Sequence, residues 1–139
     1  MISIGKESFS SVTKPAFLLD SNICIYILSD ADSLPAKRVQ QEEPGSVVIS
    51  AIIAAEIFRG AAFGDADVLA STQGFLDAIP VMPFDAEAAA RFRDVPFRRG
   101  RFDRLIAAHA LALDVVLVTN NEADFADVPG LRVENWTQA

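Results

Sequence analysis

The sequence predicts an α/β fold with three layers, in which helices cover both faces of a largely parallel sheet. Short apolar runs occur at residues 17–19, 47–50, 79–84 and 115–119, and helix-like patterns separate each run from the next. This alternation favours parallel strands, because each crossover helix returns the chain to the same edge of the sheet. The first and last runs end abruptly in polar residues, as strands do at the ligand-binding edge of such sheets.

In the first half of the chain, apolar patterning and capping residues predict two strands and three helices. The apolar run that stops at Asp20 is short enough for a buried strand, and Ser21 and Asn22 can cap the helix after it. Pro35 favours the first turn of a helix, and Ser50 can cap another helix after a β-branched strand. The helices expected from these signals span residues 22–28, 35–41 and 51–60.

In the second half, Asp65 and Asp85 precede two further helical patterns, at 65–78 and 85–94. The two prolines within 79–84 indicate an edge strand, because proline cannot donate a ladder hydrogen bond. The remaining elements are expected to be a helix at 102–113, a buried strand that ends at Thr119, and an alternating edge strand at 131–134.

The composition excludes several classes of protein. Half of the 139 residues are apolar, enough for the core of one domain, and the net charge of −7 has the wrong sign for a protein that wraps a long duplex. The single cysteine, Cys24, excludes a disulfide framework and a four-cysteine zinc site, and its apolar neighbours favour a buried side chain over a nucleophile. No run is long enough to span a membrane, and residues 1–15 lack the core of a secretory signal. We therefore expect an N-terminal extension at 1–15 and a single cytoplasmic domain at 16–139.

Four carboxylates share a predicted position at the carboxyl edge of the sheet. Asp20 and Asp124 follow strand ends. Glu56 lies in the helix after the second strand, and Asp103 opens the helix before the last long strand. The apolar neighbours of Glu56 predict that it is buried, where a carboxylate must be paired, protonated or bound to a cation. Three of them also have an ordinary structural interpretation: a polar turn at the start of a helix for Asp20, a salt bridge for Glu56, and a favourable first helical turn for Asp103.

Converging carboxylates repel one another unless a hard divalent cation lies between them, which points to Mg²⁺. Such an ion polarises a phosphodiester and activates water, so the chemistry requires no histidine base. The only histidine, His109, is more typical of a packed, hydrogen-bonded residue. A basic turn precedes Asp103, and Arg98, Arg99 and Arg101 within it either bind a phosphate backbone or form a solvated surface.

Six groups of residues keep a defined order and spacing. They are Leu19-Asp20-Ser21-Asn22, Ser50-Ala51-Ile52 with Ala55-Glu56-Ile57, Val81 to Asp85 with Ala88-Ala89, Asp103 to Leu111, Val118-Thr119-Asn120-Asn121 with Asp124-Phe125, and residues 128–136. Together they resemble the PIN-domain ribonucleases, specifically the VapC-type toxins of bacterial type II toxin–antitoxin systems. The resemblance covers residues 16–136 and implies a three-layer α/β/α PIN-like domain.

The resemblance also implies an activity, namely metal-dependent endonucleolytic hydrolysis of RNA phosphodiester bonds. The implied catalytic residues are Asp20, Glu56, Asp103 and Asp124. Asp20 and Asp103 would be the direct ligands of Mg²⁺ or Mn²⁺, Thr119 and Asn121 would support them, and Arg98, Arg99 and Arg101 would bind RNA. Many relatives carry an acid where this chain has Asn121, so either Asn121 or Asp124 fills the fourth acidic position. The segment before Asp103 is also shorter than is common in the family.

The family implies partners as well: a cognate VapB-type antitoxin that covers the acidic groove, a homodimer, and a toxin–antitoxin hetero-oligomer. Exposed apolar surface for the antitoxin is expected on the helices at 22–28 and 51–63. Two other interpretations stay open. One is a catalytically weakened PIN module that binds antitoxin or RNA without efficient cleavage. The other is a receiver-like phosphorylation domain, which would need a strand-end lysine that the sequence does not offer.

Overall fold

The computed structural model describes residues 13–99 and 101–138. The elements in chain order are β2 (Phe17–Leu19), α2 (Ser21–Ser29), α3 (Leu34–Gln41), β3 (Val47–Ser50), α4 (Ala51–Ala61), α5 (Ala66–Ala78), β4 (Val81–Met82), α6 (Ala86–Arg91), the 3₁₀ helix η1 (Phe92–Asp94), α7 (Phe102–Leu113), β5 (Val116–Val118), the 3₁₀ helix η2 (Glu122–Phe125) and β6 (Val133–Glu134). The expected extension at 1–15 lies mostly outside the described residues, so the domain boundary stays a prediction.

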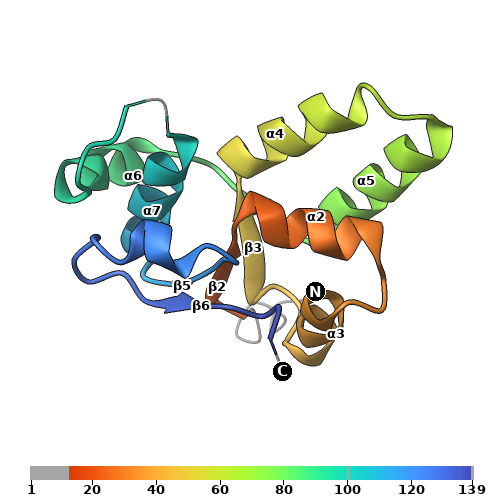
Figure 1. The fold of residues 1–139 in the computed structure, drawn as a ribbon, viewed down its shortest axis with the longest axis horizontal. Helices are drawn as coiled ribbons and strands as arrows, with labels where there is room; N and C mark the ends of the chain where they lie inside the picture. Colours follow the sequence, from red (N-terminus) through yellow and green to blue (C-terminus); the bar gives the residue numbers. More distant parts are fainter. Residues whose placement is uncertain (1–12, 100, 139) are drawn as a thin grey trace, which may run out of the picture.

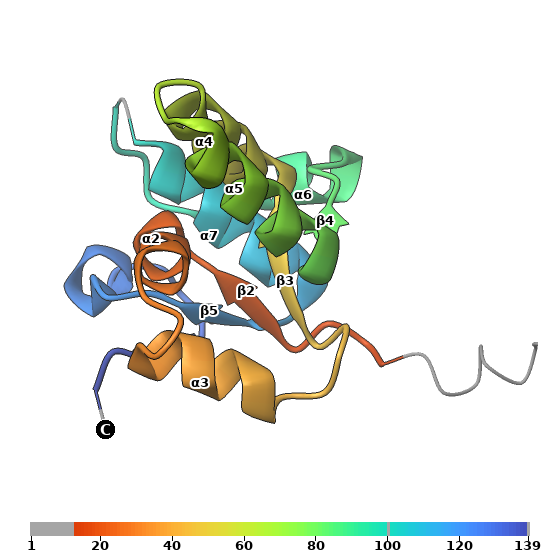
Figure 2. The same ribbon diagram turned by 90° about the vertical axis from the view of Figure 1, so that its right-hand side faces the viewer.

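The three-layer architecture is confirmed. Helices α6 and α7 lie on one side of the strands and α2 to α5 on the other (Figure 1). Helix α3 lies at the far end of the molecule from α4 and α5, which pack side by side (Figure 2). No helix in the described part of the chain is long and apolar enough to cross a bilayer.

The five described strands form one sheet in the order β4-β3-β2-β5-β6, and each neighbouring pair is parallel. Strand β2 is central, with Leu18 opposite Val48 and Leu19 opposite Val118. The predicted edge strands are confirmed at β4 and β6. Strand β4 is shorter than the expected 79–84 because prolines at 80 and 83 lack the N–H that would extend the ladder.

Side-chain caps start several helices where the sequence predicts them. Ser50 accepts a hydrogen bond from the Ile52 backbone N–H at 3.1 Å, and Asp65 and Asp85 each cap the helix that follows. At α2 the prediction was wrong in detail. Asp20 itself is the capping residue, because Ser21 already has helical geometry and donates its backbone N–H to the Asp20 carboxylate.

The core lies between the central strands and the helices that cover them. Leu18, Ile49 and Leu117 are fully buried in neighbouring strands, and Ile53 of α4 and Ile106 of α7 pack in the same cluster. Burial of this apolar surface fixes β2, β3 and β5 side by side. Their carboxyl ends therefore open at one edge of the sheet, where polar residues follow each strand.

Candidate active site

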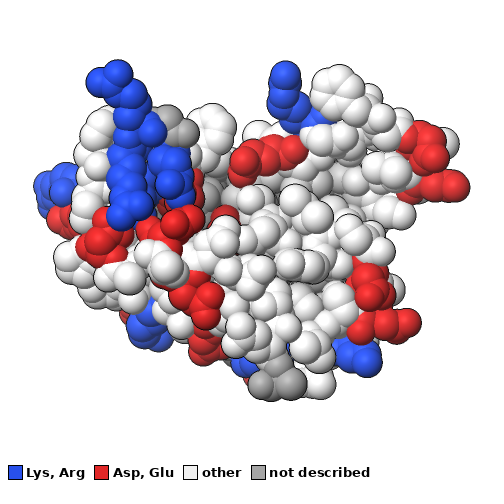
Figure 3. All heavy atoms as spheres, viewed as in Figure 1, with Lys and Arg blue, Asp and Glu red and all other residues white. Residues whose placement is uncertain are grey.

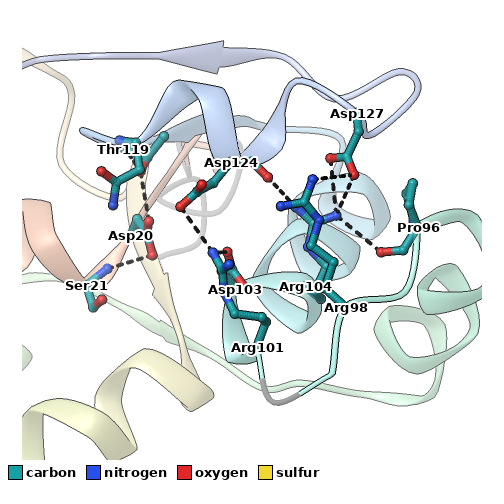
Figure 4. Close-up of polar contacts among 11 residues, drawn as sticks. Asp20, Ser21, Pro96, Arg98, Arg101, Asp103, Arg104, Thr119, Asp124 and Asp127 are labelled. Atoms are coloured by element: carbon teal, nitrogen blue, oxygen red, sulfur yellow. Dashed lines mark hydrogen bonds and ion pairs between the residues drawn. The ribbon is translucent and has the colours of Figure 1, made fainter.

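Asp20 lies at the centre of this edge because its strand, β2, is the middle strand of the sheet. Only 7% of the residue is exposed. Its carboxylate accepts hydrogen bonds from the Ser21 backbone N–H at 2.9 Å and from the Thr119 hydroxyl at 2.8 Å (Figure 4). Burial raises the pKa of Asp20, the two hydrogen bonds oppose that shift, and the nearby charges of Asp103 and Asp124 add to it. A cation placed beside it would favour the ionised form.

Thr119 joins the end of β5 to this carboxylate. The residue is fully buried, and its hydroxyl oxygen also accepts a hydrogen bond from the Asn121 backbone N–H at 3.1 Å. One side chain thus holds the Asp20 carboxylate and the start of the following loop together. The Asn121 residue itself is exposed and lines the same cavity as Asp20.

All four predicted acids line one cavity of about 280 Å³ at the carboxyl edge of the sheet. The carboxylates come from four elements: the end of β2, helix α4, the first turn of α7, and η2. The acids are Asp20, Glu56, Asp103 and Asp124. The structure therefore brings together residues that lie up to about a hundred positions apart in sequence, as the parallel topology requires.

Glu56 is exposed, so the prediction that it is buried was wrong. Its apolar neighbours Ile53 and Ile57 face the core, whereas Phe58 is exposed beside it. A helix needs only one buried face, and Glu56 lies off that face. Partial burial, with the charge of Asp20 as a second cause, raises the pKa of Glu56. Within the described residues no arginine or lysine forms a salt bridge with it.

Arg101 lies between two of the acids. Its guanidinium donates to the Asp103 carboxylate and, at 3.1 Å, to Asp124 (Figure 4). Of the other residues predicted to bind RNA, Arg98 pairs with Asp127 at 3.2 Å and Arg99 is exposed. Figure 3 shows basic side chains standing directly against a patch of acidic ones on this face. The arginines of the basic turn therefore form ion pairs with nearby aspartates, and they also present positive charge to solvent.

Sequence reasoning missed Arg104, which is fully buried next to Asp103. Its guanidinium donates to the Pro96 carbonyl at 3.2 Å, to the Asp127 carboxylate at 3.2 Å and to the Asp124 carbonyl (Figure 4). These bonds fasten the basic turn and η2 to α7. The one available signal was its position beside the inner face of an otherwise apolar helix, since arginine is rarely fully buried without a partner.

His109 does not line the acidic cavity. It is buried in α7 and packs edge-on against Phe84, with ring centroids 5.3 Å apart. Burial lowers the pKa of His109, so the neutral ring is favoured. Cys24 is also buried, as predicted, and burial raises the pKa of its thiol far above the physiological range.

The donor set suits a hard divalent cation, which takes carboxylate oxygens and retains water. Atom Oδ1 of Asp103 is buried and has no hydrogen-bond partner among the described residues. Its lone pairs are therefore free to coordinate a metal ion. In the arrangement described, no three Asp, Glu, His or Cys side chains within 13–99 and 101–138 are grouped tightly enough to enclose an ion. Asp20 and Asp103 would supply two ligands, which is sufficient for Mg²⁺.

Comparison with known proteins agrees with the family that the sequence resembles. The PIN-domain family matches this chain over residues 17–131. The tRNA(fMet)-specific endonuclease VapC of Shigella flexneri is 35% identical over 130 residues, which cover 87% of this chain and 98% of that protein. Ribonuclease VapC2 of Haemophilus influenzae strain KW20 is 30% identical over 86% of this chain and 97% of its own length.

Solved structures share the fold. The DNA-bound VapBC complex of Salmonella typhimurium contains a chain with a TM-score of 0.79 and 30% identity, covering 88% of this chain and 98% of that one. VapBC2 of Rickettsia felis, bound to a fragment of its promoter, gives a TM-score of 0.78 with 26% identity over 87% of this chain and 98% of that one.

Proposed function

Because this chain belongs to the VapC ribonucleases of the PIN-domain family, we propose that it is the RNA-cleaving toxin of a toxin–antitoxin pair and requires a divalent metal ion. The observation that carries the metal requirement is the shared cavity of Asp20, Glu56, Asp103 and Asp124, with one oxygen of Asp103 left unpartnered. Asp20 and Asp103 are the proposed ligands of Mg²⁺, for which Mn²⁺ can substitute.

When bound, the ion would polarise the phosphodiester and lower the pKa of water. The residues of the chain would orient the metal ligands and accept the proton from water. The Thr119 hydroxyl donates to one oxygen of the Asp20 carboxylate and the Ser21 backbone N–H donates to the other, so the carboxylate is oriented before metal binds. Glu56 stands exposed at the cavity, and burial and the charge of Asp20 raise its pKa, so its carboxylate would be a stronger acceptor for a proton from water.

The test is RNA cleavage by the purified, antitoxin-free chain. The first substrate is tRNA(fMet), which the Shigella relative is named for, alongside total bacterial RNA. We expect discrete fragments with Mg²⁺ or Mn²⁺ and none with EDTA, and we expect Asp103→Asn to abolish them. Asp114→Asn is the matched control, because Asp114 is highly exposed at the other end of α7. Cleavage that persists in EDTA, or in a folded Asp103→Asn variant, would refute the proposal.

A second candidate is a weakened module that binds RNA or antitoxin without efficient cleavage. The observation that favours it is Arg101, whose guanidinium already occupies Asp103 and Asp124. The same assay separates the two functions. A folded chain that binds RNA yet releases no fragment with any divalent ion would support the weakened module.

The antitoxin proposal rests on an apolar groove of about 620 Å³ between α2, α4 and α5. Ile25, Ile57 and Val68 contribute to it, and Ser21 and Glu56 line both this groove and the acidic cavity. An antitoxin segment with apolar side chains, followed by a basic one, would fit both sites in succession. We also propose that the chain forms a homodimer and acts on cytoplasmic RNA.

This surface can be tested by copurification with the antitoxin encoded alongside the toxin. Ile25→Asp places a charge in the groove and should reduce copurification strongly. Leu34→Asp is the control, because Leu34 is an exposed leucine outside the groove. Equal copurification of both variants would exclude this groove as the antitoxin site.

A further inference from the structure

Phe102 is an aromatic side chain exposed at the mouth of the acidic cavity. It is the first residue of α7, and 62% of it is open to solvent. It lines the same cavity as Asp20 and Asp124. Packing does not account for this position, because Phe102 is absent from the core cluster. The proposed metal chemistry does not use it either.

The chemical neighbours of Phe102 define what it can bind. Arg101 and Asp103 flank it in sequence, form an ion pair with each other and line the same cavity. The ring itself has no charge and no hydrogen-bond donor, so it cannot bind a phosphate. It can stack on the flat face of an unpaired base, a contact that depends little on base identity.

We propose that Phe102 is the stacking platform for the nucleobase adjacent to the scissile phosphodiester. The inference rests on the proposed ribonuclease function and names the part of the RNA that this residue binds. A base held on Phe102 would place its own phosphate over the acids, because the ring and the carboxylates line one cavity. The substrate would therefore be a single-stranded or looped region, since a paired base cannot reach an exposed ring.

The first test measures binding without turnover, with Ca²⁺ in place of Mg²⁺. A fluorescent single-stranded oligoribonucleotide should bind Phe102→Ala about tenfold more weakly than the wild-type chain. Phe102→Trp should restore binding, whereas Phe102→Leu, which is apolar but cannot stack, should not. Phe63→Ala is the matched control, because Phe63 is 83% exposed and lies outside the cavity. Equal binding by the Phe102→Leu variant and the wild-type chain would overturn the inference.

A second readout reports the contact itself. The only native tryptophan, Trp136, is almost fully buried, so the indole added by Phe102→Trp is the exposed one. We expect RNA to quench its emission, and an abasic oligonucleotide of equal length and charge not to do so. Quenching by both oligonucleotides would mean that only the phosphate is near, and the stacking role would fail.

These outcomes are separable from failure of the proposed function. If the wild-type chain cleaves RNA and Phe102→Ala cleaves with unchanged KM and kcat, the ribonuclease stands and the stacking role falls. If no cleavage occurs but base-dependent quenching does, the ribonuclease function falls, and only the stacking contact between Phe102 and a base stands. If no RNA binds at all, both fall. Unchanged thermal stability and metal affinity of the Phe102 variants would confirm that the fold and the acids are intact.

Discussion

Replacing Thr119 by valine tests how the central acid of the site is held. Valine has nearly the shape of threonine but lacks the hydroxyl that donates to Asp20 at 2.8 Å and accepts from the Asn121 N–H. Both Thr119 and Asp20 are buried, so water cannot replace the lost donor easily. The substitution therefore removes the hydroxyl and both of its hydrogen bonds, of which the one to the carboxylate is the stronger, with little change in volume.

The expected loss follows from the strength of that bond. A hydrogen bond to a charged group contributes about 1.5–3 kcal/mol. We expect Thr119→Val to lower the free energy of unfolding at pH 7 by about 2 kcal/mol. For a domain of this size that corresponds to a fall in Tm of roughly 8 °C.

The pH dependence of the loss has a defined sign. The pKa of Asp20 in the folded chain is raised by burial, and the Thr119 hydrogen bond opposes that rise. A raised pKa means that ionised Asp20 is disfavoured by folding, so stability falls as pH increases through that pKa. Without Thr119 the pKa rises further. The destabilisation should therefore be largest at neutral pH and shrink in acid, where Asp20 is protonated in both proteins.

The assay is urea unfolding of the wild-type chain and the Thr119→Val variant from acidic to neutral pH, with Thr72→Val as the control. Thr72 is a buried threonine on α5 that does not line the acidic cavity. It should show a smaller effect without this pH dependence. If Thr119→Val matched Thr72→Val at every pH, the hydroxyl would not be what holds Asp20, and the positioning role of Thr119 would be rejected.

Three further predictions concern stability, thiol reactivity and metal binding. Arg104→Met should lower the free energy of unfolding, measured with urea, by about 3 kcal/mol, because two carbonyls and a carboxylate lose a fully buried partner. The control is Arg93→Met, at a highly exposed site, which should change that free energy by less than about 0.5 kcal/mol. Cys24 should resist thiol reagents in the native chain and react on unfolding, and fast native labelling would contradict its burial. Calorimetric Mn²⁺ affinity should fall as pH decreases through the raised pKa of Asp20, and Asp124→Asn should move that fall to lower pH because Asp124 contributes to the shift; an unmoved curve would argue against this coupling.

Local patterns were sufficient to predict the fold because each strand and helix carries its own signal. Apolar runs of three to four residues became β2 and β3, and Asp65 and Asp85 capped the helices that follow them. The position of Asp20 at the carboxyl edge of the sheet followed from the same logic, since alternating strands and helices require parallel crossovers, whereas the central place of its strand is a finding of the structure. Element boundaries were less accurate, as the short β4 demonstrates.

The prediction that Glu56 is buried is wrong because apolar neighbours in sequence do not by themselves bury a residue of a helix. Its neighbours are apolar, but a helix distributes them over different faces, and only Ile53 and Ile57 reach the core. Arg104 was missed for a different reason. Its partners are a carboxylate 23 residues away and two backbone carbonyls, and no pattern in a single sequence records such contacts.

Arg101 connects the electrostatics of the site to the proposed chemistry. Two carboxylates that face one cavity repel each other, and a cation between them relieves that repulsion. In the chain by itself that cation is the Arg101 guanidinium, held by Asp103 and Asp124. A divalent ion offers twice the charge at the same carboxylates, and an exposed arginine ion pair is weak enough to yield to it. Once displaced, Arg101 would remain within one side chain's reach of the phosphate. Its pairing with the acids is therefore compatible with the RNA contact that the sequence predicts for it.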